Sequence, residues 1–532
     1  MNINEAFISY NHTGAFSKMV TDYISGNDQL KPFYSHPVSM EGIKNAIESR
    51  KQSKTDRNLL VNELQKQYQS VGLSGKTKSN IELLANENTF TICTAHQPNI
   101  FTGHLYFIYK ILHAIKLAAQ LAREFPAYNF VPVFYMGSED ADLEELGHIW
   151  IDDEKYEWKT SQSGAVGRMK VDKALLQLLD SFSGRLLAYP FGEEIVSLMR
   201  DCYQDGISIE QASFKLIHNL FAEYGLIVLL PANREFKKVF APVVKQELEE
   251  QFSQKAIKET IAEMPGEYKV QAGGREVNLF YLKEDSRERI VMDEGKWSVG
   301  NSTIHFNTEG IVKELADYPE RFSPNVILRP VFQEMILPNI VFIGGGGEIA
   351  YWLELKKVFE AVNVPFPVMV LRNSFLLLNK EQARLVKKLQ FKSADLFKPE
   401  SALMNEIVKR HSTVQLNLEK EKQQLIECYE KIRKLASKAD PTLENHTDAL
   451  KSQALKKITS LEKKMWRAER KKFEAQQRQL KTLKKQLFPE HSLQERIGNI
   501  MPFYAKWGKE IIKSFYKHSK GMEQEFCILI EQ

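Results

Sequence analysis

The sequence predicts an α/β protein with a parallel β-sheet covered by helices on both faces, to which a long antiparallel helical coiled coil is attached. Two observations predict it. Between about residues 89 and 371, short apolar runs alternate with helical segments, and the runs are apolar on both sides, as in strands buried on both faces. From 380 to 489 glycine is absent and Leu, Lys, Glu and Gln dominate, a composition typical of long helices.

The predicted sheet is built from five segments. A strand at 89–94 is followed by a loop and a helix at about 103–123, and the apolar run 130–136 forms the next strand. The same alternation returns further along the chain. We expect all these strands to belong to one sheet. The remaining strands are expected at 224–230, 340–343 and 367–371.

The core domain is therefore expected to span 1–379, with insertions at about 150–215 and 260–325 that decorate the sheet. Residues 380–489 form the coiled coil. Residues 490–532 regain aromatic side chains and end in an apolar strand-like run at 526–530, so this tail is expected to pack back on the core.

The coiled coil is expected to be a hairpin. Pro441 can open a second helix but cannot continue the first, so the two arms should fold back on each other. Apolar positions at alternating spacings of four and three predict an a/d seam in each arm. The first seam comprises Ile407, His411, Val414, Leu418, Glu421, Leu425, Cys428, Ile432 and Leu435, and the second comprises Ala454, Ile458, Leu461, Met465, Ala468 and Ala475.

Composition narrows the functional class. The 72 Lys and Arg nearly balance the 68 Asp and Glu, so net charge indicates neither nucleic acid nor a membrane as partner. The basic stretch 451–485 is expected to be a solvated coiled-coil face. The four cysteines are too dispersed for a disulfide framework or a zinc site, and the N-terminus has no export signal. A cytoplasmic protein without a tightly bound metal is expected.

The first candidate site is the loop between the first strand and its helix. His96 and His104 are candidate catalytic residues because, at the carboxyl end of a strand, they could donate hydrogen bonds to a phosphate. The neighbouring Gln97 and Gly103, and Tyr106 and Lys110 on one face of the following helix, are candidate substrate-binding residues.

The second candidate site follows the strand 130–136. Glu139 and Asp140 are candidate catalytic acids, because carboxylates at a strand end can bind an amine, orient a base or hold Mg²⁺. The nearby acids Asp142, Glu144 and Glu145 are interpreted as ordinary first-turn helix residues.

The third candidate site combines Arg329, expected to stabilise phosphate or oxyanion charge, with a run of glycines after the strand 340–343. Four consecutive glycines allow the backbone to approach a ligand closely, although a tight turn required by packing is the alternative. The candidate substrate-binding residues of this region are Gln333, Glu334, Gly344, Gly345, Gly346, Gly347, Glu348, Tyr351 and Trp352.

Several of these motifs, in this order, resemble the BshC family. They include His96-Gln97 through Lys110, Pro132 through Asp140, Arg275 through Tyr281, Asn325 through Glu334, Gly347 through Trp352, Leu487-Phe488-Pro489 and Leu493 through Arg496. The resemblance implies a Rossmann-like core similar to class I aminoacyl-tRNA synthetases, with connective-peptide insertions, and a coiled coil that supports a homodimer.

The family's task implies a reaction. It is the last step of bacillithiol synthesis, in which the carboxyl of L-cysteine is joined to the amine of glucosaminyl-malate. ATP is the expected source of activation through a cysteinyl adenylate or phosphate, with Mg²⁺ as a candidate companion. The family also implies an ATP or ADP pocket near the base of the coiled coil, which no residue here identifies. Arg372-Asn373-Ser374 occupies roughly the place of the second synthetase signature.

Two other functions compete with this reading. One is a nucleotide-binding scaffold whose coiled coil recruits the true ligase, and the other is an RNA-binding relative of the synthetases that uses the basic arm. The ligase hypothesis depends on one spatial expectation. The loops bearing His96, Glu139, Arg329 and the four glycines must converge over a single edge of one sheet.

Overall fold

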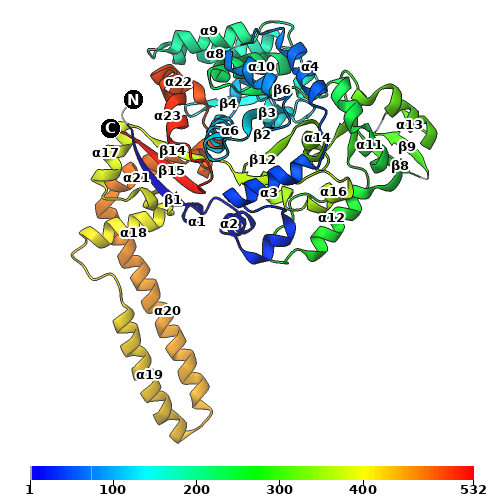
Figure 1. Cartoon of the computed structure of the whole chain (residues 1–532). Helices are drawn as coiled ribbons and strands as arrows, with labels where there is room; N and C mark the ends of the chain where they lie inside the picture. The colour runs from blue at the N-terminus through cyan, green and yellow to red at the C-terminus, as the bar shows by residue number, and fades with distance from the viewer. Residues whose placement is uncertain (1–2, 74, 294, 301) are drawn as a thin grey trace. The chain divides into compact units, whose positions relative to one another are not determined.

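The computed structural model describes residues 3–73, 75–293, 295–300 and 302–532, and divides the chain into two compact units (Figure 1). The first comprises Met1–Leu377 with Ser492–Glu531, and the second comprises Leu378–His491 with Gln532.

The first unit contains the predicted parallel sheet, and the expectation that its strands belong together is confirmed. All neighbouring pairs run parallel, in the order β13-β12-β2-β3-β6. The chain lays down β2, β3 and β6 toward one edge and then returns to add β12 and β13 on the other side of β2. The strand order therefore reverses between β2 and β12, where open α/β sheets hold ligands. The strands are β2 (Thr89–His96), β3 (Asn129–Met136), β6 (Ile227–Leu229), β12 (Asn339–Gly344) and β13 (Val368–Leu371).

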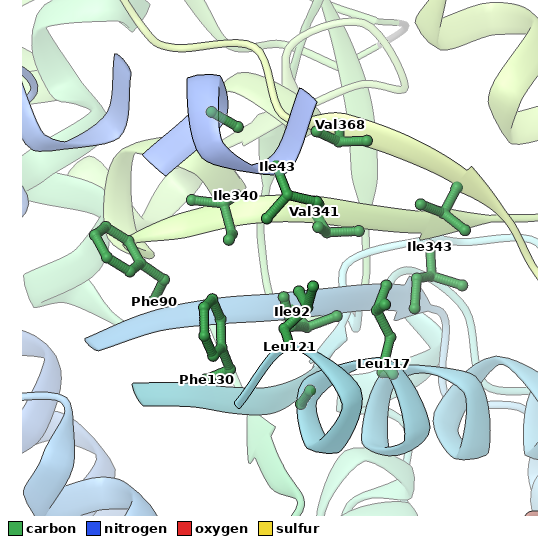
Figure 2. Packing of buried hydrophobic residues seen from close by; sticks show 14 of the residues in the cluster. Ile43, Phe90, Ile92, Leu117, Leu121, Phe130, Ile340, Val341, Ile343 and Val368 are labelled. Carbon is green, nitrogen blue, oxygen red and sulfur yellow. The ribbon is translucent and has the colours of Figure 1, made fainter. Parts of the chain in front are cut away.

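One face of this sheet is covered by α3 (Met40–Lys51) and α6 (Leu105–Glu124). Figure 2 shows Ile43 of α3 and Leu117 and Leu121 of α6 packed with alternating strand residues such as Ile92 and Ile343. Helix α6 is long and apolar enough to cross a membrane, but most of it is buried in this core. Its hydrophobicity is accounted for by sheet packing.

The opposite face is covered by α15 (Gly346–Trp352) and α16 (Lys356–Ala361). The Trp352 ring stacks on Phe342 with 4.1 Å between ring centroids, and Phe359 packs beside it. Phe342 alternates with Val341 and Ile343 along β12, so it points away from the face that α6 covers. Both faces of the strand are thus buried, which explains why the sequence run is continuously apolar.

Segments inserted between the parallel strands form two further substructures. Between β3 and β6 lie α7 (Leu143–Leu146), the hairpin β4 (His148–Ile151) and β5 (Glu154–Glu157), α8 (Lys173–Leu187), α9 (Gly192–Cys202) and α10 (Ile209–Phe221). Between β6 and β12 lie α11 (Arg234–Glu250), α12 (Phe252–Glu263), α13 (Thr308–Asp317), α14 (Arg329–Ile336) and an antiparallel sheet in the order β10-β9-β8-β7-β11. Its strands are β7 (Leu279–Leu282), β8 (Arg287–Asp293), β9 (Lys296–Val299), β10 (His305–Phe306) and β11 (Phe322–Pro324).

The two ends of the chain meet in a small sheet. β15 (Glu525–Glu531) lies between β1 (Ile3–Ser9), with which it pairs antiparallel, and β14 (Ser374–Leu378). This unit also contains several further α-helices. They are α1 (Tyr10–Thr13), α2 (Lys18–Ile24), α4 (Arg57–Tyr68), α5 (Gly75–Leu83), α22 (Ile500–Trp507) and α23 (Glu510–His518).

The second unit is helical, but its first arm is not continuous as expected. Helix α18 (Glu400–His411) ends before α19 (Glu419–Ala439) begins. In the break, the Ser412 hydroxyl accepts the Val414 N–H and the Asn417 side chain accepts the Glu419 N–H. Such local side-chain acceptors compete with helical hydrogen bonds and end the first helix. The other helices are α17 (Lys380–Lys388), α20 (Leu443–Arg470) and α21 (Glu474–Leu487).

α19 and α20 form the antiparallel hairpin, as Figure 1 shows, but the predicted seam of α19 is wrong. Cys428 is exposed, and Ile432 and Leu435 are 44% and 68% exposed. The half-buried side of α19 instead runs one residue further along, through Lys422, Ile426, Tyr429, Arg433 and Ala436. Ion pairs also link this side of α19 to α20. These pairs are Lys422–Glu462 at 2.6 Å, Lys451–Glu430 at 2.6 Å and Arg433–Glu444 at 2.8 Å. In the second predicted seam Leu461 is also 53% exposed, and Ala468 and Ala475 are exposed, whereas Ala454, Ile458 and Met465 are half-buried.

Candidate active site at the carboxyl edge of the parallel sheet

A cavity of about 470 Å³ opens at the carboxyl ends of β2, β3 and β12. The loops that bear His96, Glu139, Arg329 and Gly345–Gly347 all line it, so the expected convergence over one sheet edge is confirmed. The insertion between β6 and β12 contributes Gln271, Arg287 and Asn325 to the wall. The cavity therefore lies at the point where the strand order reverses, with the antiparallel insertion on its rim.

Most of the predicted site residues contact this cavity. The lining includes His96, Gln97, Tyr106, Lys110, Glu139, Asp140, Arg329, Gly345, Gly346, Gly347, Glu348 and Tyr351.

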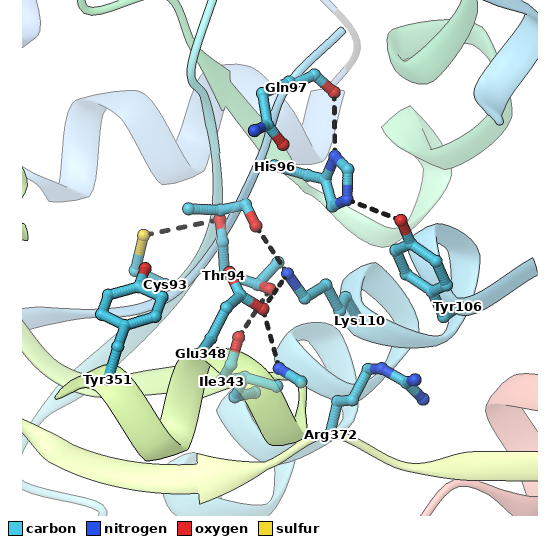
Figure 3. Close-up of polar contacts among 12 residues, drawn as sticks. Cys93, Thr94, His96, Gln97, Tyr106, Lys110, Ile343, Glu348, Tyr351 and Arg372 are labelled. Carbon is cyan, nitrogen blue, oxygen red and sulfur yellow. Dashed lines mark hydrogen bonds and ion pairs between the residues drawn. The ribbon is translucent and has the colours of Figure 1, made fainter. Parts of the chain in front are cut away.

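A buried ion pair between Lys110 and Glu348 forms the floor of the site (Figure 3). Lys110, whose side chain is 2% exposed, also donates to the Ala95 carbonyl at 2.7 Å. Glu348 accepts the Gly345 N–H at 2.8 Å. Burial alone would raise the pKa of Glu348, but the Lys110 ammonium outweighs it and lowers this pKa, so the carboxylate stays charged. The pair fixes the ends of β2 and β12 relative to each other.

His96 is neutral at physiological pH. Burial, reinforced by the Lys110 charge, lowers its pKa to about 3. Its Nδ1 lies 3.2 Å from the Gln97 carbonyl oxygen, which can only accept, so Nδ1 carries the proton. Nε2 then accepts the Tyr106 hydroxyl at 3.0 Å (Figure 3). His96 therefore cannot supply the positive charge that would make it a strong phosphate ligand.

The two candidate acids are held differently. Glu139 pairs with Lys237 of α11, its Oε1 lying 2.7 Å from Nζ, and Lys237 also donates to the Phe322 carbonyl at 2.8 Å. Asp140 accepts the Gln97 side-chain amide at 3.0 Å and lies 3.8 Å from the Arg287 guanidinium. Both carboxylates are therefore oriented by neighbours before any ligand binds.

Arg329 has no carboxylate at ion-pair distance among the residues that the structure describes. Its Nη2 donates to the Tyr351 hydroxyl at 3.0 Å, its Nη1 donates to the Gln333 side-chain oxygen at 3.3 Å, and its guanidinium lies 5.7 Å from the Tyr135 ring centre. All of these partners are neutral. The positive charge of Arg329 is thus available to an anionic group in the cavity.

The four glycines divide into two kinds. A Cβ on Gly344 would come within 2.9 Å of the Phe342 ring, and one on Gly346 within 3.1 Å of Phe16, so packing explains these two. A Cβ on Gly345 would meet atoms only at 3.5 Å or beyond, and one on Gly347 would meet none within 4 Å. Neither has a positive φ. The fold does not require glycine at 345 and 347, which favours close approach of a ligand there.

Six predicted residues lie outside the cavity lining, and the predictions of direct ligand contact for them are not supported. Gly344 and Trp352 pack in the core as described above. Gln333 and Glu334 are fully buried, and the Glu334 carboxylate binds Arg50 at 2.9 Å. Gly103 has φ +61°, which suits glycine, and His104 donates to the Ile497 carbonyl at 3.2 Å. Burial lowers the pKa of His104 to about 4, so it too is neutral.

Four further charged residues line the cavity, namely Glu145, Arg287, Arg372 and Arg496. Sequence reasoning missed Arg287, and it named Arg372 only in the place of a second synthetase signature and Arg496 only within a family motif. Glu145 was assigned to the first turn of a helix, where it does lie, but it also faces the cavity. Arg287 and Arg496 lie in segments with no strand or glycine signal of their own. Only their tertiary placement brings them to the site.

The charged residues are not arranged as a metal centre. Within residues 3–73, 75–293, 295–300 and 302–532, no group of three or more His, Cys, Asp and Glu side chains is placed to hold an ion. All four cysteines, which lie in this described part, are free thiols.

The fold and the cavity together define a Rossmann-like α/β protein with a charged ligand site at the point where its strand order reverses. The family models match in two parts. "Bacillithiol biosynthesis BshC, N-terminal Rossmann-like domain" spans residues 1–373, and "Bacillithiol biosynthesis BshC, C-terminal coiled-coil domain" spans residues 375–531. The chain belongs to the BshC family of bacillithiol biosynthesis.

Curated relatives agree with this assignment. A protein of Flavobacterium johnsoniae named "Putative cysteine ligase BshC" is 40% identical over 98% of this chain and 99% of its own length. Proteins of the same name from Flavobacterium psychrophilum and Christiangramia forsetii are 38% and 36% identical, each over 98% of both chains. A solved structure titled as an arginyl-tRNA synthetase from Campylobacter jejuni covers 84% of this chain and 98% of its own, but its 11% identity and TM-score of 0.24 support no argument.

Proposed function

We propose that this chain is a cytoplasmic cysteine ligase that joins the carboxyl of L-cysteine to the amine of glucosaminyl-malate, the last step of bacillithiol synthesis. The observation that carries the proposal is the cavity, which brings two oriented carboxylates, Glu139 and Asp140, together with the uncompensated cation Arg329. In amide formation, a carboxylate can bind the attacking amine and take its proton, and a cation can stabilise the oxyanion charge. The family membership and the names of the relatives support the same reaction.

In this proposal Arg329 stabilises the negative charge that develops on the cysteine carboxyl oxygen as the amine attacks. Its charge needs no reorganisation, because Tyr351 and Gln333 already hold the guanidinium. Glu139 and Asp140 bind and orient the incoming amine. Proton removal falls to one of these carboxylates, since His96 has both ring nitrogens engaged.

ATP is proposed as the source of activation, because an amine does not displace oxide from a free carboxylate. The cysteine carboxylate would form an adenylate with release of pyrophosphate, or an acyl phosphate with release of ADP, and the amine would then displace AMP or phosphate. The residues present fit an anionic co-substrate. Arg329 offers an unpaired positive charge, and Gly345 and Gly347 leave room for phosphate oxygens beside the backbone. Mg²⁺ would bind together with the phosphates. Asp140 and Glu145 line the cavity, and their carboxylates supply the oxygen ligands that Mg²⁺ prefers.

The test is reconstitution with the purified full chain, L-cysteine and glucosaminyl-malate, with and without ATP and Mg²⁺. Product and either AMP or ADP are followed by mass spectrometry. Arg329→Ala is expected to lower kcat/KM about 100-fold, the usual effect of losing one oxyanion-stabilising group. Arg200→Ala, which removes an exposed arginine paired with Asp180, is the matched control and should leave turnover unchanged. Lack of product from the wild-type chain alone would favour the scaffold hypothesis.

We further propose that the chain forms a homodimer through the coiled coil. The exposed Cys428, Ile432 and Leu435 follow spacings of four and three on one face of α19. On α20, the exposed Leu443, Leu450 and Leu461 are spaced by seven and eleven and also share a face. These exposed residues lie outside the half-buried side of the hairpin, so this apolar surface is left over, and burying it against a second copy is the favourable outcome.

The oligomeric state tests this directly. Leu435→Lys places a charge in the proposed interface and is expected to shift the chain from dimer to monomer in sedimentation velocity experiments. Lys434→Ala, an exposed lysine on the same helix but outside the apolar face, is the control. A wild-type chain that sediments as a monomer at micromolar concentration would rule the dimer out.

A further inference from the structure

Several hydrogen bonds of buried side chains hold the short turn Gln494–Arg496 in place. Gln494 bonds β14 in both directions, accepting the Leu377 N–H at 3.0 Å and donating to the Leu377 carbonyl at 3.1 Å. Glu495 is fully buried and accepts from the Arg372 guanidinium at 2.7 Å and from the Ser374 hydroxyl at 3.1 Å. Two buried polar side chains thus anchor one turn to one strand end.

The residues that follow are tied to the loop at the end of β2. The Asn499 side chain donates to the carbonyls of Phe101 at 3.0 Å and Gly103 at 2.6 Å, and the Leu105 N–H donates to the Gly498 carbonyl at 2.7 Å. His104 adds its hydrogen bond to the Ile497 carbonyl. These hydrogen bonds explain the roles of His104 and Gly103, which were expected to contact the ligand directly. They hold the turn in place.

The turn carries Arg496 into the cavity. Unlike Arg372, whose charge is neutralised by Glu495, Arg496 has no carboxylate at ion-pair distance in the part of the chain that the structure describes. Its side chain is exposed to the cavity and to solvent, whereas the residues on both sides of it in the turn are anchored. A rigid support for a free guanidinium indicates a ligand for that guanidinium, because no described residue forms an ion pair with it.

We propose that Arg496 is a substrate-binding residue that holds an oxyanion, a phosphate or carboxylate group, at the end of the cavity formed by Tyr106, Arg372 and Gly345–Gly347. A guanidinium matches the planar fork of such a group and binds it through two hydrogen bonds. Arg372 faces the same space, but its charge is compensated by Glu495, so Arg496 supplies the positive charge there. Arg329 lines the same cavity but contacts other residues, Tyr351 and Tyr135.

Two sources can supply the oxyanion, the phosphates of ATP or the malate carboxylates of glucosaminyl-malate. The proposal rests on the proposed function only for this choice of probes. Isothermal titration calorimetry of the full chain would measure the Kd of ATP, of glucosaminyl-malate and of malate, for the wild type, Arg496→Ala and Arg496→Lys. Lys509→Ala, an exposed cation of the same C-terminal segment outside the cavity, is the control.

Arg496→Ala is expected to weaken one of the two substrates about 10- to 100-fold, as loss of a charge-assisted hydrogen-bonding partner does. Arg496→Lys should recover part of the loss, because it keeps the charge without the fork. Weakening of ATP alone assigns the subsite to phosphate, and weakening of glucosaminyl-malate and malate assigns it to carboxylate. The matching KM should rise in turnover assays with a smaller change in kcat.

Equal Kd values for wild type and Arg496→Ala with every probe would overturn the proposal, even if the chain makes product. Failure of the wild type to make product, with Arg496-dependent binding intact, would instead reject the proposed function alone. Binding of no probe by the wild type would reject both. Thermal melting should be unchanged in Arg496→Ala, because its side chain makes none of the anchoring bonds, so a folding defect cannot imitate the expected result.

Discussion

Replacing Glu334 by alanine should destabilise the first unit, although Glu334 does not line the cavity. The carboxylate is fully buried and binds Arg50, whose side chain is 2% exposed, at 2.9 Å. Its second oxygen accepts the Gln333 amide at 2.9 Å and the Asn339 amide at 2.8 Å. The variant removes the carboxylate acceptor of a buried guanidinium and of two buried side-chain amides.

Breaking a buried ion pair by removing one partner costs about 3–5 kcal/mol. The lower end applies here, because Arg50 keeps hydrogen bonds to the carbonyls of Asn339 and Glu334. The double variant Arg50→Met/Glu334→Leu should recover part of the loss, since it removes the uncompensated charge but leaves those carbonyls without a donor. Glu360→Ala, an exposed acid, should change stability by less than about 0.5 kcal/mol.

Urea unfolding followed by tryptophan fluorescence suits this measurement. Five of the six tryptophans lie in the first unit, and Trp466→Phe removes the signal of the second. A loss below about 1 kcal/mol, combined with loss of ligand binding, would refute the structural role and restore Glu334 to the substrate site where the sequence placed it.

Three further predictions test the site, its protonation and the coiled coil. Gly347→Ala should fold at least as stably as the wild type but bind substrate more weakly, whereas Gly344→Ala should lose stability through its clash with Phe342. Circular dichroism melts measure the stability of the two variants, and substrate titration measures their binding. Equal melting temperatures for the two variants would contradict the packing argument. His96 has a pKa of about 3 in the folded chain and about 6.5 unfolded, so the stability it contributes is complete above pH 6.5 and is lost as pH falls toward 3. Wild type should therefore lose stability faster than His96→Gln between pH 7 and pH 4 in denaturant titrations, and parallel curves would show that His96 is protonated in the folded chain. In the hairpin, Lys422→Ala should cost at most about 1 kcal/mol, because its ion pair with Glu462 is near the surface; a larger loss in the helical signal would mean that these pairs determine the pairing of the arms.

The sequence alone predicted the parallel sheet, because strands buried on both faces must be continuously apolar, and this pattern is visible in 130–136 and 340–343. It also predicted that His96, Glu139 and the glycine run meet, since the carboxyl ends of parallel strands share one edge. It could not separate residues at the edge from those one turn deeper. Gln333 and Glu334 follow Arg329 on the same helix, yet only Arg329 reaches the cavity.

The coiled coil shows the same limit. Heptad spacing identifies which positions share a helix face, but not which face turns toward the other arm. In α19 the half-buried side carries Ile426 and Tyr429 together with the ion-paired Lys422 and Arg433. Periodicity is a property of a segment by itself. The choice of partner depends on what the neighbouring helix offers.

The amino-acid sequence by itself determined the fold class, the hairpin and the loops that carry chemistry, because each follows from local periodicity and from residues close together in the chain. Only the tertiary structure decided which charges are free. Arg50, Lys237 and Arg372 are neutralised by carboxylates distant in sequence, whereas no carboxylate of the described residues lies at ion-pair distance from Arg329 or Arg496. Charge compensation depends on distances of a few ångströms between segments, and those distances exist only in the folded chain.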